Sequence, residues 1–301
     1  MKVLVTGGTG FIGQNLISYF KSKHISVDNL SREILQNNKK LKLFFEENQS
    51  EKNKTYDVCI HLAAELEDTS KQLISVNVSL TKKLLNLCLK NKINRFIFTS
   101  SHLVYGKTEY LPIDEDHVKK PKTKYGKSKL LAEEICKSFS ENSDLQVTIL
   151  RISSVFGPGQ NEKYIIPRMF QNILSQNIVL HKYSNGYQLL DLIHVDDVSR
   201  AIFKACISKK YGVYNLSLGF GITPFDLAKV ISKFVNHCKI IVKNKKNKTN
   251  HFLYDVSKIK NELNFSASSK PDLKTLEPWF KKNLKQNKSQ YSRNLNNKRK
   301  L

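Results

Sequence analysis

The chain has 301 residues, which is enough for one large domain or two smaller ones, and 40% of them are hydrophobic and 25% charged. It has no apolar stretch of the ~18 residues that a membrane helix needs. The formal net charge is +24, but residues 239–301 carry 17 Lys and Arg against four Asp and Glu, a net of +13. More than half of the excess charge therefore lies at one end of the chain. This distribution predicts no specific nucleic-acid partner. The five cysteines form no C-x-x-C pair, which fits reduced thiols in a cytoplasmic protein and argues against a metal site.

The first predicted element is a strand at residues 2–6, because its apolar run lacks polar alternation, as in a strand buried on both faces. Apolar residues recur at helical spacing after the glycines, so the glycines lie in a strand-to-helix turn. Gly8, Gly10 and Gly13 match the motif G-x-G-x-x-G. In this motif Gly8 allows a tight turn, Gly10 lets the backbone approach a pyrophosphate, and Gly13 lets the helix pack closely on the strand. Backbone N–H groups and the helix dipole would face the phosphates, so we expect a dinucleotide site rather than a turn without a ligand.

Strands and helices then alternate through the first half of the chain. Further strands are expected at residues 25–31, 41–45, 58–62, 95–100 and 146–152. Helical patterns lie at 75–91, 125–139, 164–175 and 193–207, the last with Asp196 as its N-cap. This alternation predicts an α/β fold, a Rossmann-type doubly wound parallel sheet with a smaller C-terminal substrate domain.

The expected domain boundaries follow from the loosening of this pattern near residue 156. The dinucleotide-binding domain is expected at 1–155, with 181–205 returning to it, and the substrate domain at 156–180 and 206–285. Residues 286–301 contain no acid and no periodicity, so they are expected to form a disordered basic tail.

Two side chains on one predicted helix carry the candidate chemistry. Tyr125 and Lys129 stand at i and i+4, so they share a face of the helix. An ammonium group beside a phenol favours the phenolate and lowers a pKa that is normally ~10, so Tyr125 is expected to act as a general base near neutral pH. Ser101 follows the strand at 95–100, at the edge of the sheet where ligands bind, and its hydroxyl can hold the same substrate oxygen.

The sequence resembles the extended short-chain dehydrogenase/reductases in seven segments: TGGTGFIG, IHLAA, FTSSHLVYG, YGKSK, LRISSVFGPG, IHVDDV and YNLSLG. More narrowly, it resembles the NAD-dependent epimerase/dehydratase family that acts on nucleotide sugars, over about residues 1–280. The resemblance implies a Rossmann fold, a bound nicotinamide cofactor, and Ser101, Tyr125 and Lys129 as the catalytic set, with Lys129 also holding the nicotinamide ribose. It further implies a nucleotide-sugar substrate, a homodimer and a place in polysaccharide biosynthesis.

The same resemblance implies a wider set of binding residues. Asn77 matches a helix asparagine near the active site, and Tyr105 and Ser154 match positions near the sugar, so these last two are expected to bind the substrate together with Ser101. Besides Tyr125 and Lys129, the expected cofactor contacts are Gly7, Gly8, Gly10, Phe11, Ile12, Gly13, Leu62, Ala63, Ala64 and Asn77.

The sequence departs from the family pattern in the substrate half of the site. Dehydratases of this group carry Asp-Glu directly after the catalytic Ser or Thr, whereas this chain has His102 and Leu103 there. Leucine transfers no proton, so 4,6-dehydration is not expected. Leu190 replaces an arginine that grips the nucleotide diphosphate, so this grip is either absent or relocated, with Arg168 as the candidate replacement.

Two residues compete for the adenosine ribose. Asp28, in the segment VDNLSR, would hold the ribose hydroxyls of NAD, but it follows Gly13 by only 15 residues, against a usual ~20. Arg32 follows Gly13 by 19 residues and can bind the 2′-phosphate of NADP. We expect NAD, with NADP as the alternative.

The function expected from these residues is nucleotide-sugar epimerisation at C4. Tyr125 takes a hydroxyl proton while the carbon transiently transfers hydride to NAD, the keto-sugar rotates, and the steps reverse on the other face. The first alternative is an NADPH-dependent reductase of a nucleotide-linked keto-sugar, and the second is a non-catalytic nucleotide-binding scaffold or redox sensor. No metal, no membrane and no specific nucleic acid are expected to take part.

Overall fold

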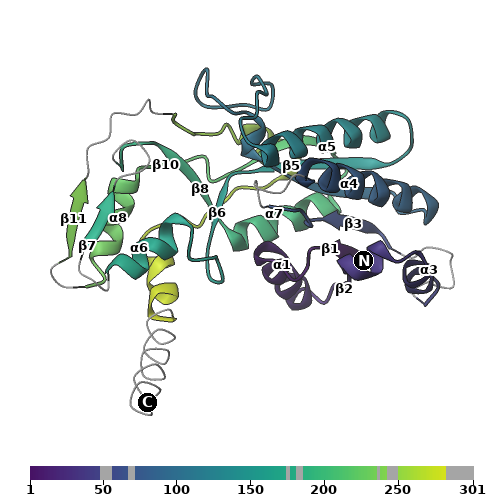
Figure 1. The fold of residues 1–301 in the computed structure, drawn as a ribbon, viewed down its shortest axis with the longest axis horizontal. Helices are drawn as coiled ribbons and strands as arrows, with labels where there is room; N and C mark the ends of the chain where they lie inside the picture. Colours follow the sequence, from purple (N-terminus) through teal and green to yellow (C-terminus); the bar gives the residue numbers. More distant parts are fainter. Residues whose placement is uncertain are drawn as a thin grey trace, which may run out of the picture.

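The computed structural model describes residues 1–47, 56–66, 72–173, 177–180, 186–235, 238–242 and 250–282. A six-stranded parallel sheet lies at its centre, in the order β2-β1-β3-β4-β5-β9 (Figure 1). Its strands are β1 (Lys2–Thr6), β2 (Ser26–Leu30), β3 (Val58–His61), β4 (Arg95–Ser101), β5 (Gln146–Ile152) and β9 (Gly212–Leu216). The chain passes from β1 outward to β2 and then back to β3 on the other side of β1, so the sheet order reverses beside β1. Ligands bind at such a reversal, outside the carboxyl ends of the strands.

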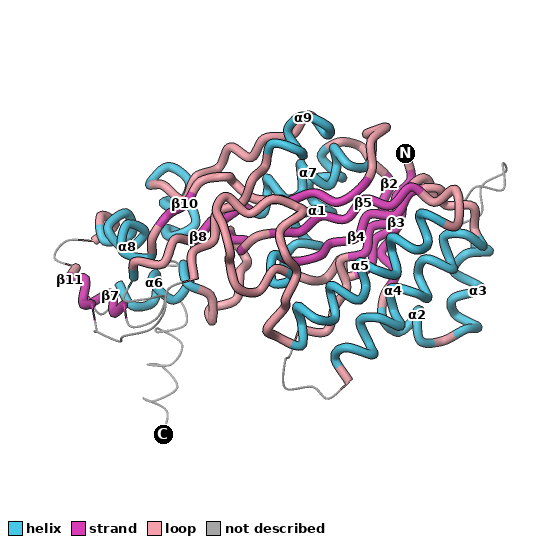
Figure 2. Tube along the Cα trace, turned by 90° about the horizontal axis from the view of Figure 1, so that it is seen from above, coloured by secondary structure: helices cyan, strands magenta, loops and turns pink. Residues whose placement is uncertain are grey.

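Helices cover both faces of this sheet, as the alternation in the sequence predicts (Figure 2). Val3 and Val5 pack on one side and Leu4 on the other, so β1 is buried on both faces. The helices on the side of Val3 are α1 (Phe11–Ser22), α7 (Val195–Ile207) and α9 (Ser257–Leu263). Those on the side of Leu4 are α2 (Arg32–Gln36), α3 (Asn38–Glu47), α4 (Leu73–Lys90) and α5 (Lys124–Glu141).

A smaller hydrophobic core forms beyond the carboxyl ends of the central strands. Among the described residues it joins one three-stranded sheet, one two-stranded sheet and three helices, the last over residues 273–282, from which Trp279 packs edge-on against Phe170. The elements are β6 (Ser154–Phe156), β8 (Leu190–His194), β10 (Gly221–Ile222), β7 (Asn177–Leu180), β11 (Lys239–Val242), α6 (Ile165–Ile173) and α8 (Pro224–Ser232). Leu190 lies in this core, where it packs among apolar side chains.

Two expectations about local structure are wrong. Residues 41–45 form part of helix α3 instead of a strand, because Leu41 and Phe45 bury one helical face and the Asn37 side chain accepts hydrogen bonds from two N–H groups at its start. The N-cap of α7 is His194, whose Nδ1 accepts from Asp196 N at 3.3 Å, so Asp196 lies inside the helix.

The expected domain boundaries also need a correction. β9 completes the central sheet by pairing with β5, so part of the segment 206–285 returns to the dinucleotide-binding half. The expected tail at 286–301 lies outside the described residues. In the described part of the chain no helix is long and apolar enough to cross a membrane, and no cluster of three His, Cys, Asp or Glu side chains is suited to a metal ion. All five cysteines are free thiols.

Candidate active site

The glycine turn after β1 is shaped by close backbone contacts. Gly7 has φ +76°, and a Cβ on it would lie 2.6 Å from Ala63 N, while a Cβ on Gly13 would lie 2.2 Å from the Gly7 carbonyl oxygen. Gly8 is tied to β2, since its N–H donates to Asn29 Oδ1 at 3.0 Å. Gly10 is different: a Cβ there would meet only the Gly7 oxygen, at 3.3 Å, and otherwise open space. Gly10 is also the N-cap of α1 and provides no side-chain cap, so the N–H groups at this helix start are available to a phosphate.

Alanine at Gly10 is expected to leave the fold intact but to weaken NAD binding about tenfold, or roughly 1.4 kcal/mol, because its methyl group enters the space beside the helix start. Alanine at Gly13 is expected to lower the melting temperature, because its Cβ collides with backbone atoms that cannot move independently. Thermal melts and NAD titrations of both variants separate the two roles. Equal losses of thermal stability in the two variants would contradict this assignment.

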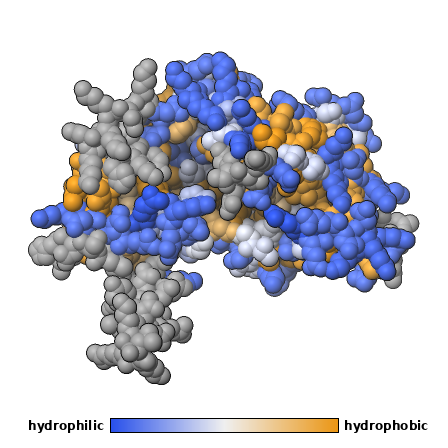
Figure 3. Space-filling model, in the orientation of Figure 1, coloured by the Kyte–Doolittle hydropathy of each residue, from blue (hydrophilic) through white to orange (hydrophobic). Residues whose placement is uncertain are grey.

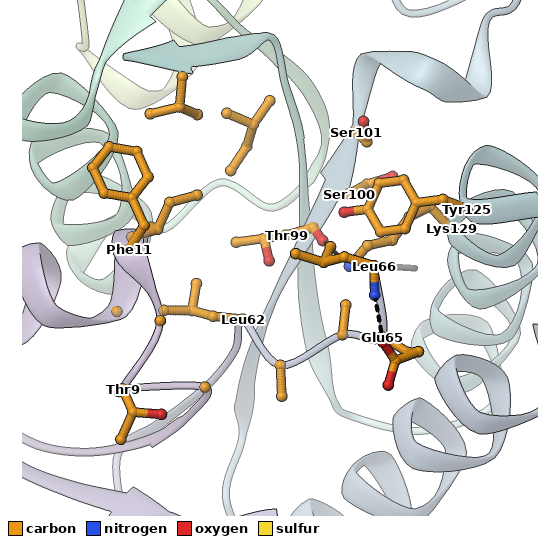
Figure 4. A pocket seen from close by; sticks show the side chains of 18 of the residues that line it. Thr9, Phe11, Leu62, Glu65, Leu66, Thr99, Ser100, Ser101, Tyr125 and Lys129 are labelled. Carbon is orange, nitrogen blue, oxygen red and sulfur yellow. Dashed lines mark hydrogen bonds between the residues drawn. The ribbon is translucent and has the colours of Figure 1, made fainter. Parts of the chain in front are cut away.

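A cavity of about 1150 Å³ extends from this turn to the carboxyl ends of β4 and β5. Figure 4 shows Thr9 and Phe11 at one end of it, Ser101, Tyr125 and Lys129 at the other, and Leu62 and Thr99 between them. Thirteen of the predicted residues line it: Gly7, Gly10, Phe11, Ile12, Gly13, Arg32, Leu62, Ala63, Ala64, Ser101, Tyr125, Lys129 and Ser154. The cavity therefore joins the dinucleotide motif to the predicted catalytic set in one continuous space.

Helix α5, which carries Tyr125 and Lys129, is fixed at its first turn. The Thr123 hydroxyl caps it by accepting from Gly126 N at 2.9 Å, and Gly126 lies so close to the loop after β4 that a Cβ would be 2.6 Å from the Leu103 carbonyl oxygen. One turn further, Lys129 Nζ donates to the Thr99 carbonyl at 2.7 Å and lies 5.7 Å from the centroid of the Tyr125 ring. Both side chains thus face the end of β4, as the i,i+4 spacing predicts.

Burial controls the ionisation of both groups. It raises the pKa of the Tyr125 phenol, and the neighbouring Tyr164 raises it further. The expectation that Lys129 lowers the pKa of the Tyr125 phenol toward neutral is therefore wrong when only the protein groups surround it. In these surroundings the phenol keeps its proton and can donate it. Burial also lowers the pKa of Lys129 to about 8, because the ammonium group is removed from water.

The shifted pKa of Lys129 predicts a pH dependence. Its charged form predominates below pH 8 and is lost as the pH rises through about 8. If the ammonium group is needed to bind the cofactor and to support Tyr125, kcat/KM falls across this range, since kcat/KM reports the ionisations of the free enzyme. A pH profile of kcat/KM checks this, and a flat profile across this interval would show that the charge of Lys129 is not required.

Asn77 supports the site from behind instead of lining it. Its side chain accepts from Glu65 N at 2.7 Å and donates to Ser128 Oγ at 3.0 Å, so it ties the loop after β3 to helix α5. Its predicted role as a direct cofactor contact stays a prediction.

The structure does not bring Asp28 to the cavity. Asp28 lies within β2, paired in register with Leu4, and its carboxylate accepts from the Tyr56 hydroxyl at 2.9 Å and lies 3.5 Å from Lys2 Nζ. The sequence string resembles the family motif, but the strand runs on to Leu30 before it reaches the ligand edge. Arg32 does line the cavity, where its guanidinium is 3.7 Å from the Glu65 carboxylate.

Two of the predicted substrate-binding residues also lie away from the cavity. Tyr105 is 1% exposed, and its hydroxyl bonds Asn215 and Arg151 inside the protein. Arg168 is exposed on α6 and donates to the Lys163 carbonyl at 2.9 Å. Lys163 itself lines the cavity and provides a cation on the substrate side.

Sequence reasoning missed several lining residues. Gln160 is the most informative, because its Nε2 donates to the Val155 carbonyl at 2.6 Å, which turns Oε1 the other way. Among the described residues, this Oε1 is the one buried side-chain polar atom without a hydrogen-bond partner, so it fits a ligand that offers a donor. Its position just after the segment FGPG is the sequence signal that could have pointed to it. Other missed lining residues include Asn29, Ser31, Leu35, Gln36, Glu65, Leu80, Lys83, Thr99, His102, Asn161, Lys163 and Tyr164.

Comparisons with known proteins identify a family and several similar proteins. Residues 3–217 match the model of the NAD dependent epimerase/dehydratase family. A putative UDP-glucose 4-epimerase of Methanocaldococcus jannaschii is 30% identical over 72% of this chain and 77% of that protein. A dTDP-D-glucose 4,6-dehydratase of Dictyostelium discoideum is 32% identical over 76% of this chain, which spans 61% of that protein. The structure of a UDP-N-acetylglucosamine 4-epimerase from Methanobrevibacter ruminantium superposes with a TM-score of 0.80 at 26% identity, over 95% of this chain and 98% of that one.

Proposed function

The chain belongs to the NAD-dependent epimerase/dehydratase family, and we propose that it is a nucleotide-sugar epimerase acting at C4. The cofactor is NAD, as in the family, and the glycine turn with its uncapped helix start fits the pyrophosphate. The observation that carries the proposal is the single cavity in which this turn meets Ser101, Tyr125 and Lys129.

In the proposed reaction the hydroxyl groups of Ser101 and Tyr125 hold the oxygen on C4 of the sugar. When bound, NAD supplies the hydride acceptor for C4 and a positive nicotinamide ring that favours the phenolate. Tyr125 takes the proton of the C4 hydroxyl and returns it to the C4 oxygen after the keto-sugar has turned over in the cavity. Lys129, held by the Thr99 carbonyl, stays under the tyrosine and orients the ribose.

Epimerisation is favoured over dehydration by the residues that follow Ser101. Dehydration at C5 and C6 needs a base to take a proton from carbon, and Leu103 offers none. The only carboxylate among the described lining residues is Glu65, whose Oε2 is 3.7 Å from Arg32.

Analysis of the nucleotide retained by the purified protein tests the proposal, because an epimerase regenerates its cofactor and keeps NAD bound. A site that is empty after purification and takes up NADPH would indicate the reductase instead.

The reductase is supported by one observation at the end of β2. Ser31 and Arg32 line the cavity there, and among the described lining residues at positions 29–36 none is an acid that could hold the ribose hydroxyls. A guanidinium group binds a phosphate in bidentate geometry, so Arg32 suits the 2′-phosphate of NADP.

Arg32→Ala is expected to weaken NADP binding about tenfold, or roughly 1.4 kcal/mol, while NAD affinity changes little. Asp28→Ala is expected to change neither affinity, because the Asp28 side chain contacts Tyr56 and Lys2 instead of the cavity. Fluorescence titration of both cofactors against both variants measures the four affinities. Selective loss of NAD binding in Asp28→Ala would restore Asp28 as the ribose ligand.

The assembly and location that we propose are a homodimer in the cytoplasm. Helices α4 and α5 lie side by side and expose Val76, Leu89 and Leu131, and Figure 3 shows apolar residues gathered over this part of the surface. A patch of this kind is typical of an interface. Light scattering of Leu131→Glu tests it, since a charge at the centre of this face is expected to give monomers. The five free thiols fit a reducing compartment.

A further inference from the structure

His102 follows Ser101 directly and lines the cavity at the start of the short helix η1 (His102–Val104). Its Nδ1 lies 2.8 Å from the Tyr254 hydroxyl, and its ring packs edge-on against Phe252. We propose that His102 is a substrate-contacting residue, whose Nε2 hydrogen-bonds a hydroxyl group of the sugar, and that Tyr254 is the positioning residue that orients it. The inference rests on the proposed function and adds a specificity element to the same site.

Tyr254 is anchored well enough to orient the histidine. It is 3% exposed, its N–H donates to Asp191 Oδ2 at 3.2 Å, and its backbone pairs with Ile113. Hydrogen bonds from Ile113 N to the Leu253 carbonyl and from Asp255 N to the Ile113 carbonyl, at 2.7 and 2.8 Å, hold this segment on both sides. The phenol therefore presents its hydroxyl to His102 from a fixed position, and the imidazole has one preferred orientation.

The imidazole is neutral at physiological pH. Burial lowers the pKa of His102 to about 4, because the charged ring would lose its hydration. Within the described chain, the bond to Tyr254 is the one hydrogen bond made by the His102 side chain. If the Tyr254 hydroxyl donates to Nδ1, Nε2 carries the proton of the neutral ring and is a donor. If Nδ1 donates to the hydroxyl, Nε2 is an acceptor.

A sugar hydroxyl satisfies both possibilities, because it can donate as well as accept. A carboxylate can only accept, so it suits just the form in which Nε2 carries the proton. Since His102 is the neighbour of Ser101, which binds the C4 oxygen in the proposed reaction, the hydroxyl belongs to a part of the sugar close to C4. The contact that we assign to His102 is therefore a sugar hydroxyl group near C4.

A double-mutant cycle tests this inference with whichever of UDP-glucose, UDP-N-acetylglucosamine and dTDP-glucose the wild type converts. His102→Ala is expected to lower kcat/KM about tenfold, the effect of one hydrogen bond in a closed site, and to leave NAD affinity unchanged. Tyr254→Phe is expected to lower it less, and to have no further effect in the His102→Ala background, because Tyr254 acts through His102. His102→Gln, whose amide reaches the place of Nε2, is expected to recover part of the loss.

Tyr214→Phe is the matched control. It removes the hydroxyl of another buried tyrosine, bonded to Glu262 at 2.7 Å, which does not line the cavity, so kcat/KM should not change. Equal effects of Tyr254→Phe with and without His102 would overturn the positioning role, and an unchanged kcat/KM in His102→Ala would overturn the contact. If the wild type converts none of the three sugar nucleotides, the proposed function fails, and this inference fails with it.

Discussion

Replacing Tyr125 with phenylalanine is expected to lower kcat by about 10²–10⁴-fold while NAD binding stays nearly unchanged. The substitution removes only the hydroxyl group that, in the proposed reaction, exchanges a proton with the C4 oxygen. The ring remains on α5 beside Lys129, and the glycine turn, where we propose that the pyrophosphate binds, lies at the other end of the cavity. Steady-state kinetics and an NAD titration of the variant measure the two effects separately.

Tyr56→Phe is the control for this experiment. It also removes a partly buried phenol hydroxyl, which bonds Asp28 and does not line the cavity, so turnover should be unaffected. More than half of the wild-type activity in Tyr125→Phe would remove Tyr125 from the mechanism. A parallel loss of NAD affinity would show that the phenol holds the cofactor rather than the sugar oxygen.

Glu133→Ala is expected to lower the free energy of unfolding by about 3–5 kcal/mol, because it leaves a buried guanidinium group without its counter-charge. Glu133 and Arg151 are 0% and 2% exposed, and their carboxylate and guanidinium groups meet at 2.8 Å. The same guanidinium donates to the Tyr105 hydroxyl at 3.1 Å, and Ser100 donates to the Glu133 carboxylate. The loss therefore reaches the end of β4, next to Ser101.

Glu277→Ala is the matched control for the buried pair. Glu277 and Lys281 meet at a similar distance, 2.7 Å, but both side chains are about half exposed or more. Exposed pairs contribute little, so the free energy of unfolding should change by less than about 0.5 kcal/mol. Chemical denaturation measures the free energy of unfolding of both variants. Because the two ion pairs have similar distances, the difference between the variants reports the effect of burial. Equal destabilisation would mean that Arg151 finds another partner or water when Glu133 is lost.

Local patterns in the sequence were sufficient for the parts of the site built within one turn or one helix. The glycine turn, Tyr125 and Lys129 depend on spacings of a few residues, and the structure brings them to one cavity. Asp28 was misplaced because a short string can match a motif while the strand is displaced by a few residues from the ligand edge. The helix at 41–45 was mistaken for a strand because a short apolar run has no clear period, and the buried i,i+4 pair Leu41 and Phe45 decides it.

The remaining features depend on contacts between distant segments. Tyr105 bonds Asn215, 110 residues away, and His102 bonds Tyr254, 152 residues away, so no local pattern indicates which of these two residues faces the cavity. The unpartnered oxygen of Gln160 arises because the Val155 carbonyl fixes the amide, which is a property of the folded loop. Residues that line a site through such contacts become visible only in three dimensions.

Conversion of UDP-glucose, UDP-N-acetylglucosamine or dTDP-glucose carrying deuterium at C4, in the presence of NAD, tests the central claim most directly. A C4 epimerase takes the hydride from the sugar and returns it to the same carbon, so NMR should show two interconverting C4 epimers that both retain the deuterium, with no net reduction of NAD. A 4-keto-6-deoxy product would contradict the account in favour of a dehydratase. One-way consumption of NADPH with a keto-sugar, and no conversion of the labelled sugars, would contradict it in favour of a reductase.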